Sequence, residues 1–324
     1  MKRGQRVAYQ QLALGGQYDK QVYGVAKSVV TNKKQNPELT IATGNVSVTF
    51  DKATGFLSGY RNGSVELMAE GGTLRPNFWR ATTDNDLGAG LQKKYKVWRN
   101  PTLKLESLTV ERGNVKRQMP ATVTARYDMP EVSARLLLRY ELLEGGALRV
   151  SQQLEASDTA KVSDMFRFGM VMTLPNDMDR SKFYGRGPVE NYIDRNASQR
   201  LGIYEQTTMD QFYPYVRPQE TGTKTDVRWW AQTNAIGEGL TVSGAKSLSM
   251  SALPYSIETL DEGEWRHQRH PSELETSPFV TLCIDDVQMG VGGINSWGAL
   301  PLEEHRVHYG SRSFEFTIVP TAAD

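Results

Sequence analysis

The sequence predicts an all-β protein built from two large antiparallel sheets that pack face to face. Short segments of alternating apolar and polar residues recur from about residue 39 to the end of the chain, which is the period of a half-buried strand. These segments follow one another without helical segments between them, which favours antiparallel over parallel pairing. No repeat of roughly 20 to 50 residues is visible, so a propeller or a solenoid is not expected.

The first residues, "MKRGQRVAYQQLAL", read as one strand, because alternate residues such as Ala8 and Leu12 fall on the same face. A single strand cannot bury such a face. We therefore expect residues 1–14 to be the last strand of a domain whose earlier part is absent from this chain. Residues 15–38 are polar and weakly patterned, which predicts a linker over the surface. Residues 39–324 are expected to form one large β-domain.

Within that domain, Gly55 and the hairpin signal Asn62-Gly63 divide the first alternating stretch into short strands. The best candidate for a helix is a short one near residues 87–97. The later alternating segments predict strands at 121–129, 133–142, 147–156, 166–174, 238–245, 247–256, 279–293 and 313–320.

Composition excludes several classes of protein. The formal net charge is +1, which argues against a general attraction to nucleic acid or to anionic lipid. The basic stretch 93–99 contains apolar residues and is typical of an amphipathic turn or short helix. Cys283 is the only cysteine, so no intrachain disulfide is possible, and its neighbours predict a buried strand. No run of 18 apolar residues marks a membrane span.

Catalytic residues are not evident from the residue pattern. A glycosidase needs two carboxylates on either side of the scissile bond, and every candidate pair lies in a turn or at a strand end, where acidic residues are common for structural reasons. The histidines offer no third ligand for a metal and no clear partner for acid–base chemistry. The carboxylates considered are Asp84, Asp86, Glu190, Asp194, Asp261 to Glu264, Asp285, Asp286, Glu303 and Glu304, and the histidines are His267, His270, His305 and His308.

Aromatic residues next to polar loop groups are the more informative feature. The segment "YGRGPVENYIDR", residues 184–195, combines turn residues with charges and predicts an elaborate loop. Trp229 and Trp230 are adjacent in a strand, so at least one is expected in the core. Trp297 is surrounded by glycines, Asn295 and Ser296, which predicts a loop that holds the indole at a surface. Aromatic rings and polar loop groups together are typical of sugar contact.

Five segments, "VAYQQLAL", "FWRATTDNDLG", "FYGRGPVENYIDR", "YPYVRPQETG" and "QMGVGGINSWG", resemble the carboxyl end of glycoside hydrolase family 2 β-galactosidases of the large bacterial kind. The resemblance covers nearly the whole chain. It implies that residues 1–14 end an immunoglobulin-like domain and that the rest is a β-super-sandwich of the galactose-mutarotase-like class. It also implies that Trp297 is substrate-binding, in a loop that reaches the active-site mouth and stacks on the sugar. Ile294 and Asn295 depart from the enterobacterial pattern, which has two acidic residues there.

In this family both catalytic glutamates and the ligands of magnesium and sodium belong to a (β/α)₈ barrel upstream. The resemblance therefore implies a chain with no catalytic residue and no metal ligand of its own. Its expected partners are a galactoside, the upstream barrel and immunoglobulin-like domains, and further copies of the enzyme in an oligomer. The sequence does not distinguish a cytoplasmic from a periplasmic location.

Two hypotheses follow. The first is a non-catalytic C-terminal domain that completes the galactoside site of a β-galactosidase. The second is a free-standing aldose 1-epimerase on the same fold, which would need a histidine acid and a carboxylate base in the sandwich cleft. The five ordered segments favour the first, because the four histidines cannot be paired with a base from the sequence.

Overall fold

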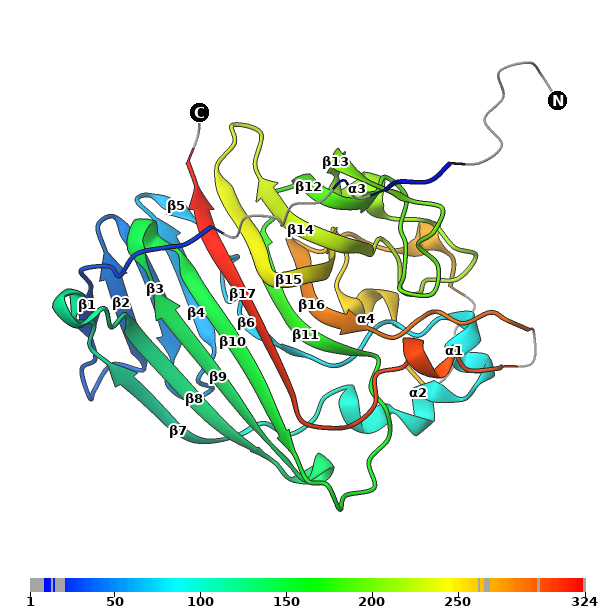
Figure 1. Ribbon diagram of the computed structural model, residues 1–324, viewed down its shortest axis with the longest axis horizontal. Helices are drawn as coiled ribbons and strands as arrows, with labels where there is room; N and C mark the ends of the chain where they lie inside the picture. The colour runs from blue at the N-terminus through cyan, green and yellow to red at the C-terminus, as the bar shows by residue number, and fades with distance from the viewer. Residues whose placement is uncertain are drawn as a thin grey trace.

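The computed structural model describes residues 9–12, 14, 21–261, 263–264, 269–295 and 298–322. In these residues seventeen strands form one hydrogen-bonded sheet in which every pairing is antiparallel (Figure 1). None of the helices in this part of the chain is long and apolar enough to cross a membrane.

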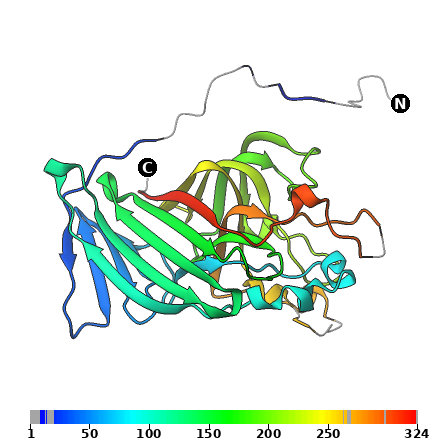
Figure 2. The same cartoon turned by 60° about the horizontal axis from the view of Figure 1, so that its bottom comes forward.

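The sheet has two arms, which lie one over the other (Figures 1 and 2). The first arm runs in the order β1, β2, β3, β4, β6, β11, β16, and β5 pairs with β4 beside it. Its strands are β1 (Val29–Thr31), β2 (Glu38–Thr43), β3 (Val46–Asp51), β4 (Leu57–Asn62), β5 (Val65–Glu66), β6 (Leu74–Asn77), β11 (Arg167–Pro175) and β16 (Phe279–Gln288).

The second arm runs in the order β7, β8, β9, β10, β17. Its strands are β7 (Lys104–Glu111), β8 (Ala121–Met129), β9 (Ala134–Leu142), β10 (Leu148–Ala156) and β17 (Arg312–Thr321). Apolar residues alternate with exposed ones along these strands, so that one face is buried against the first arm.

One long strand, β15 (Gly239–Leu253), joins the two arms. Its first part, residues 239–244, pairs with β17, and its last part, residues 249–253, pairs with β16. Beyond β15 the sheet continues through β14 (Lys224–Thr233), β12 (Arg180–Gly187) and β13 (Arg200–Thr207). The layers are therefore continuous at β15 and separate on either side of it.

The core lies between the two arms. Phe50 on β3 meets Tyr140 on β9 edge to face, with ring centroids 4.9 Å apart, and both rings are almost fully buried. Burying such a side chain stabilises the fold by about 1.5–3 kcal/mol. The arms approach closely at Gly146, where φ is +79° and a Cβ would lie 2.5 Å from a methyl group of Val46. Only glycine fits this position.

Helices are few and short. A capping box begins α1, and a second capping box begins α3. The α-helices are α1 (Asp84–Gly88), α2 (Leu91–Lys94), α3 (Thr208–Gln211) and α4 (Ile257–Leu260), and the 3₁₀ turns are Lys96–Trp98, Val115–Arg117, Pro130–Val132, Glu144–Gly146, Pro271–Glu273 and Glu303–His305.

The predicted all-β antiparallel architecture is confirmed, with the two predicted sheets joined through β15 as the two arms of one sheet, and so is the short helical region near 87–97. The basic stretch 93–99 forms α2 and the turn after it, and its Trp98 is fully buried. The segments 238–245 and 247–256, predicted as two strands, are instead one bent strand, because β15 changes partner without leaving the sheet.

The loop predicted at 184–195 is partly wrong. β12 continues through Gly187 and pairs with β13 over its whole length, and the turn begins only at Pro188, after a cis peptide bond. Backbone hydrogen bonds need no side chain, so the two glycines do not interrupt the ladder.

The N-terminal region also differs in part from the predicted strand and linker. Tyr9–Leu12 are not in a strand; instead the Gln11 side chain pairs with both the amide and the carbonyl of Leu201, at 2.8 and 2.9 Å, on the edge of β13. Of the segment predicted as a linker, residues 29–31 form the edge strand β1. Residues 1–8, 13 and 15–20 lie outside the described part of the chain.

Candidate functional site

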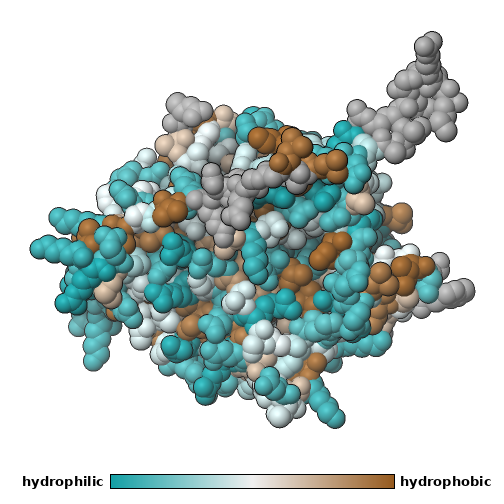
Figure 3. All heavy atoms as spheres, viewed as in Figure 1, coloured by the Kyte–Doolittle hydropathy of each residue, from teal (hydrophilic) through white to brown (hydrophobic). Residues whose placement is uncertain are grey.

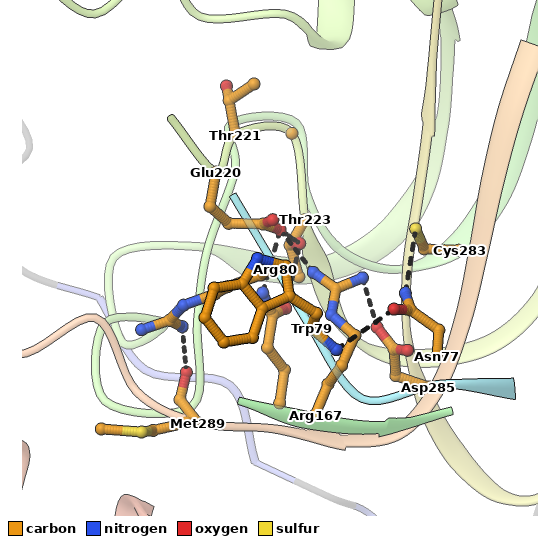
Figure 4. Close-up of polar contacts among 12 residues, drawn as sticks. Asn77, Trp79, Arg80, Arg167, Glu220, Thr221, Thr223, Cys283, Asp285 and Met289 are labelled. Atoms are coloured by element: carbon orange, nitrogen blue, oxygen red, sulfur yellow. Dashed lines mark hydrogen bonds and ion pairs between the residues drawn. The ribbon is translucent and has the colours of Figure 1, made fainter. Parts of the chain in front are cut away.

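A loop follows β16, residues 289–300, and side chains from distant segments hold its first residues. The Arg80 guanidinium donates from Nη1 to the Met289 carbonyl at 2.5 Å (Figure 4). It also donates from Nη2 to the Gly290 carbonyl at 3.0 Å. The Asp194 carboxylate accepts hydrogen bonds from the next two backbone amides, at 3.0 and 2.9 Å. Four consecutive residues at the base of the loop thus have their backbone groups fixed.

Arg80 is itself fixed by α1. Its Nη2 lies 2.9 Å from Oδ1 of Asp86 and its Nε lies 3.2 Å from Oδ2. Asp86 also closes the capping box with Thr83, accepting the Thr83 amide at 2.9 Å. Arg80 and Asp86 are both buried. A buried charge needs such partners, so Asp86, considered above as a catalytic candidate, serves as the anchor of Arg80.

The far end of the loop also meets α1. Gly298 has φ of +78°, and a Cβ there would lie 2.6 Å from the backbone of Gly88. Asn85 donates from Nδ2 to the Val291 carbonyl at 2.9 Å. The loop therefore leaves and returns beside the same short helix, and a side chain at position 298 would push the two apart.

A second buried network lies beside Arg80, around Arg167 on β11 (Figure 4). Nη2 of Arg167 is 2.9 Å from Oε1 of Glu220, and Nη1 is 3.3 Å from Oδ2 of Asp285. Glu220 also accepts hydrogen bonds from Thr223 at 3.0 Å and from Gln288 at 2.9 Å. One guanidinium thus serves two carboxylates in the interior.

Burial raises the pKa of Asp285 to about 7; Arg167 opposes this rise and Glu220 adds to it. The Asp285 carboxyl group therefore holds a proton for part of the time at neutral pH. Burial also raises the pKa of the neighbouring Cys283 thiol to about 12. Cys283 is a buried strand residue, as predicted.

A third network links "YGRGPVENYIDR" to "YPYVRPQETG". Glu190 accepts hydrogen bonds from the Gly222 amide at 2.8 Å, the Thr221 hydroxyl at 2.9 Å and the Tyr215 hydroxyl. Arg195 lies 2.9 Å from the same carboxylate. Burial, followed by the hydrogen bond to Glu190, raises the pKa of Tyr215. Glu190 is therefore a structural link between the two segments.

The three networks bring together the four internal segments on which the family resemblance rests. Segment 78–88 supplies Arg80 and α1, segment 183–195 supplies Glu190 and Asp194, segment 213–222 supplies Glu220, and all of them surround the base of segment 288–298. Strand pairing alone does not require this convergence. It marks this end of the molecule as the candidate functional site.

Most of the other carboxylates considered from the sequence also have partners, and Glu262 lies outside the described residues. Asp261 accepts from the Trp79 indole at 2.8 Å and pairs with Arg99 at 3.0 Å. Burial raises the pKa of Asp286. The remaining pairs are Asp84 with Arg217 at 3.0 Å, Glu264 with Lys96 at 3.8 Å, Glu303 with Arg306 at 2.6 Å and Glu304 with His305 at 3.8 Å.

The histidines give no metal site in the described residues, where no group of three or more His, Cys, Asp or Glu side chains could hold an ion. His308 contacts two carboxylates, with Nδ1 3.0 Å from Asp164 and Nε2 3.0 Å from Glu303, but about half of its side chain is exposed. His270 is exposed at the surface. His267 lies outside the described residues.

Trp297 also lies outside the described residues, as does Ser296, so its role as the substrate-binding residue stays a prediction. Its described neighbour Ile294 is exposed. Of the adjacent pair in β14, Trp230 is fully buried and Trp229 is not, which confirms that one of them belongs to the core.

Sequence reasoning did not single out Arg80 or Arg167, which organise the site. Both lie among apolar residues, in "NFWRAT" and "MFRFGMVM". An arginine in an otherwise apolar segment is a signal that could have found them, because a buried guanidinium must have buried carboxylate or carbonyl partners.

Comparison with known proteins identifies the family. Residues 42–319 match the family described as "Beta galactosidase small chain". The chain belongs to the β-galactosidase small-chain family. The sequence-based resemblance to β-galactosidases is thereby confirmed, and the aldose 1-epimerase alternative is not favoured.

Individual β-galactosidases are consistent with this family assignment. A β-galactosidase of Priestia megaterium is 34% identical over 98% of this chain, and the match covers 30% of that protein. A β-galactosidase of Lactobacillus delbrueckii subsp. bulgaricus is 35% identical over 68% of this chain and 21% of its own length. The chain thus spans less than a third of these relatives. A galactose 1-epimerase structure from Lactobacillus acidophilus aligns with 92% of this chain and 98% of its own, at 9% identity and a TM-score of 0.44.

Proposed function

We propose that this chain is the non-catalytic C-terminal domain of an enzyme that hydrolyses terminal β-galactosides, and that loop 289–300 completes the galactoside site. In this proposal Trp297 stacks on the sugar, and the reaction takes place on the two glutamates of an upstream (β/α)₈ barrel. Magnesium and sodium bind in that barrel. Residues 1–14 close an immunoglobulin-like domain, and residues 15–38 lead to the β-domain.

The convergence of four segments on the base of loop 289–300 is the observation that supports this proposal. A stacking residue contributes most when it is held in place before the sugar arrives, since ordering a loop on binding costs free energy. Arg80 and Asp194 supply this order by fixing consecutive backbone groups of the loop.

The surface around the loop has the character of an interface with another domain. Several apolar side chains from the converging segments are exposed there, and Figure 3 shows hydrophobic atoms at the end of the molecule that carries α1 and the loop. Exposed apolar groups of this kind mark interaction surfaces. We assign them to contact with the upstream domains. They are Val189, Ile193, Tyr213, Val216 and Ile294.

The test is to mix the purified chain with a separately expressed upstream fragment that ends before residue 1, and to measure hydrolysis of a chromogenic β-galactoside. We expect no turnover from the chain alone and recovered turnover in the mixture. The Trp297→Ala chain should restore activity with a KM raised roughly five- to tenfold, since loss of an aromatic stacking partner costs about 1–1.4 kcal/mol. Its melting temperature should be close to that of the unchanged chain.

Turnover by the chain alone, clearly above the buffer background, would refute a non-catalytic role. An unchanged KM for the Trp297→Ala mixture would remove Trp297 from the site while leaving the domain assignment intact.

A further inference from the structure

A row of side chains crosses the outer face of the sheet, away from loop 289–300. Strand register places Tyr184, Trp229, Ser243, Thr317 and Arg149 directly opposite one another on β12, β14, β15, β17 and β10. Directly opposed residues of antiparallel strands share a face. The preceding or following residue on each strand points into the core, which sets this row on the outside.

A groove of about 470 Å³ runs along this row. This volume is within the range of small-molecule sites. Trp229 lies at one end and Arg149 at the other, and hydroxyl groups form the floor between them. The described lining residues are Gln21, Val22, Tyr23, Arg149, Trp229, Thr241, Ser243, Gly244, Ala245, Glu315, Phe316, Thr317 and Val319.

Contacts with neighbouring residues fix the side chains at the two ends of the groove. The neighbour of Trp229, Trp230, is fully buried and stacks on Phe183 with centroids 4.7 Å apart and planes 10° apart, which anchors this stretch of β14. Arg149 is oriented by Glu141, with Nη1 3.1 Å from Oε2. These contacts hold an indole and a guanidinium in place on either side of the hydroxyl groups.

The chemistry of the groove selects one class of ligand. Glu141 and Glu315 offset the charge of Arg149, so the groove is not an anion site. The apolar lining, which consists of Trp229, Tyr23, Ala245, two valines and the buried Phe316, is too small and too interrupted by polar groups for a lipid. An aromatic ring beside hydroxyl, carboxylate and guanidinium groups matches a sugar. A sugar has an apolar C–H face that stacks on the ring and hydroxyl groups that both donate and accept hydrogen bonds.

We propose that this groove is a second saccharide site, in which a disaccharide stacks one ring on Trp229 and bonds its hydroxyls to Thr317, Ser243 and Arg149. It is independent of the galactoside site proposed above, since it uses neither loop 289–300 nor an upstream domain. Its role is to hold a carbohydrate on the domain without cleaving it.

The test is titration calorimetry of the 324-residue chain with lactose and with cellobiose, together with saturation-transfer NMR. We expect saturable binding of at least one of them. Trp229→Ala should weaken it about tenfold and Trp229→Phe less, because a smaller ring remains. Thr317→Val removes one hydroxyl at nearly constant shape, so it should weaken binding several-fold in a folded chain. Thr109→Val, at an exposed position of β7, is the matched control and should leave binding unchanged. The Trp297→Ala chain is measured beside it to separate the two sites.

Absence of saturable binding of both sugars to the unchanged chain would overturn the proposal. So would unchanged affinity in a folded Trp229→Phe or Thr317→Val chain, or loss of binding in the Trp297→Ala chain, which would place the sugar at loop 289–300. Because this assay involves no hydrolysis, its outcome is separate from that of the fragment-mixing experiment.

Discussion

The overlapping arms of the sheet and the end that carries loop 289–300 are held together by different forces. Between the arms, apolar rings such as Phe50 and Tyr140 pack in a continuous core. At the loop end, buried arginines bind buried carboxylates and backbone carbonyls. Apolar packing tolerates many sequences of the right size, whereas a buried charge network requires particular partners.

This difference explains why the recognisable segments gather at the loop end. Each supplies a group whose partner lies on another segment, as Arg80 does for the carbonyls of Met289 and Gly290. The arms, in contrast, contain only one residue of the quoted internal segments, Gln288 at the end of β16. Mutations can test how different the two regions are.

The largest effect is expected for Arg167→Met. The change leaves Glu220 and Asp285 buried without their cation, which should lower the free energy of unfolding by about 3–5 kcal/mol. Urea unfolding measures this quantity. Arg61→Met is the matched control, because Arg61 pairs with Glu66 at the exposed surface and should change the free energy by less than about 1 kcal/mol. Equal losses in the two variants would mean that the Arg167 network does not hold this end together.

A smaller effect is expected for Gly146→Ala, where the arms approach each other. The new methyl group meets Val46 and the residue keeps a positive φ, so the loss should be about 1–3 kcal/mol. Thermal unfolding checks it. Gly145→Ala is the control for backbone strain alone, since φ there is +71° and nothing lies within 4 Å of the new Cβ. If the two variants have the same melting temperature, the steric contact between the new methyl group and Val46 does not lower the stability of the fold.

The last effect is a dependence on pH, which is small for each pH unit. The pKa of Asp285 is about 7 in the folded protein and near 4 in an unfolded chain, so the folded state binds the proton more tightly. The stability that this proton contributes is present below about pH 4 and is lost as pH rises to 7, by about 1.4 kcal/mol per pH unit. Asp285→Asn should remove this part of the pH dependence. Parallel curves for both proteins between pH 5 and pH 7 would contradict it.

The sequence by itself determined the strands, because alternation has a period of two and each buried face needs a partner. β8 was predicted with its observed bounds, and β9, β10 and β17 to within one residue. The sequence also determined the family, since five ordered segments are more specific than any one of them.

Only the tertiary structure decided what those segments do. Alternation does not show where a strand changes partner, so the pattern predicts two strands where the structure has the single bent strand β15. Nor does alternation show which charged residues, far apart in the sequence, bind one another. Arg80 lies more than 200 residues from the carbonyls it binds, and Glu190 over 30 residues from the Gly222 amide. Such contacts depend on how the arms place distant loops side by side, and that is a property of the packed sheet.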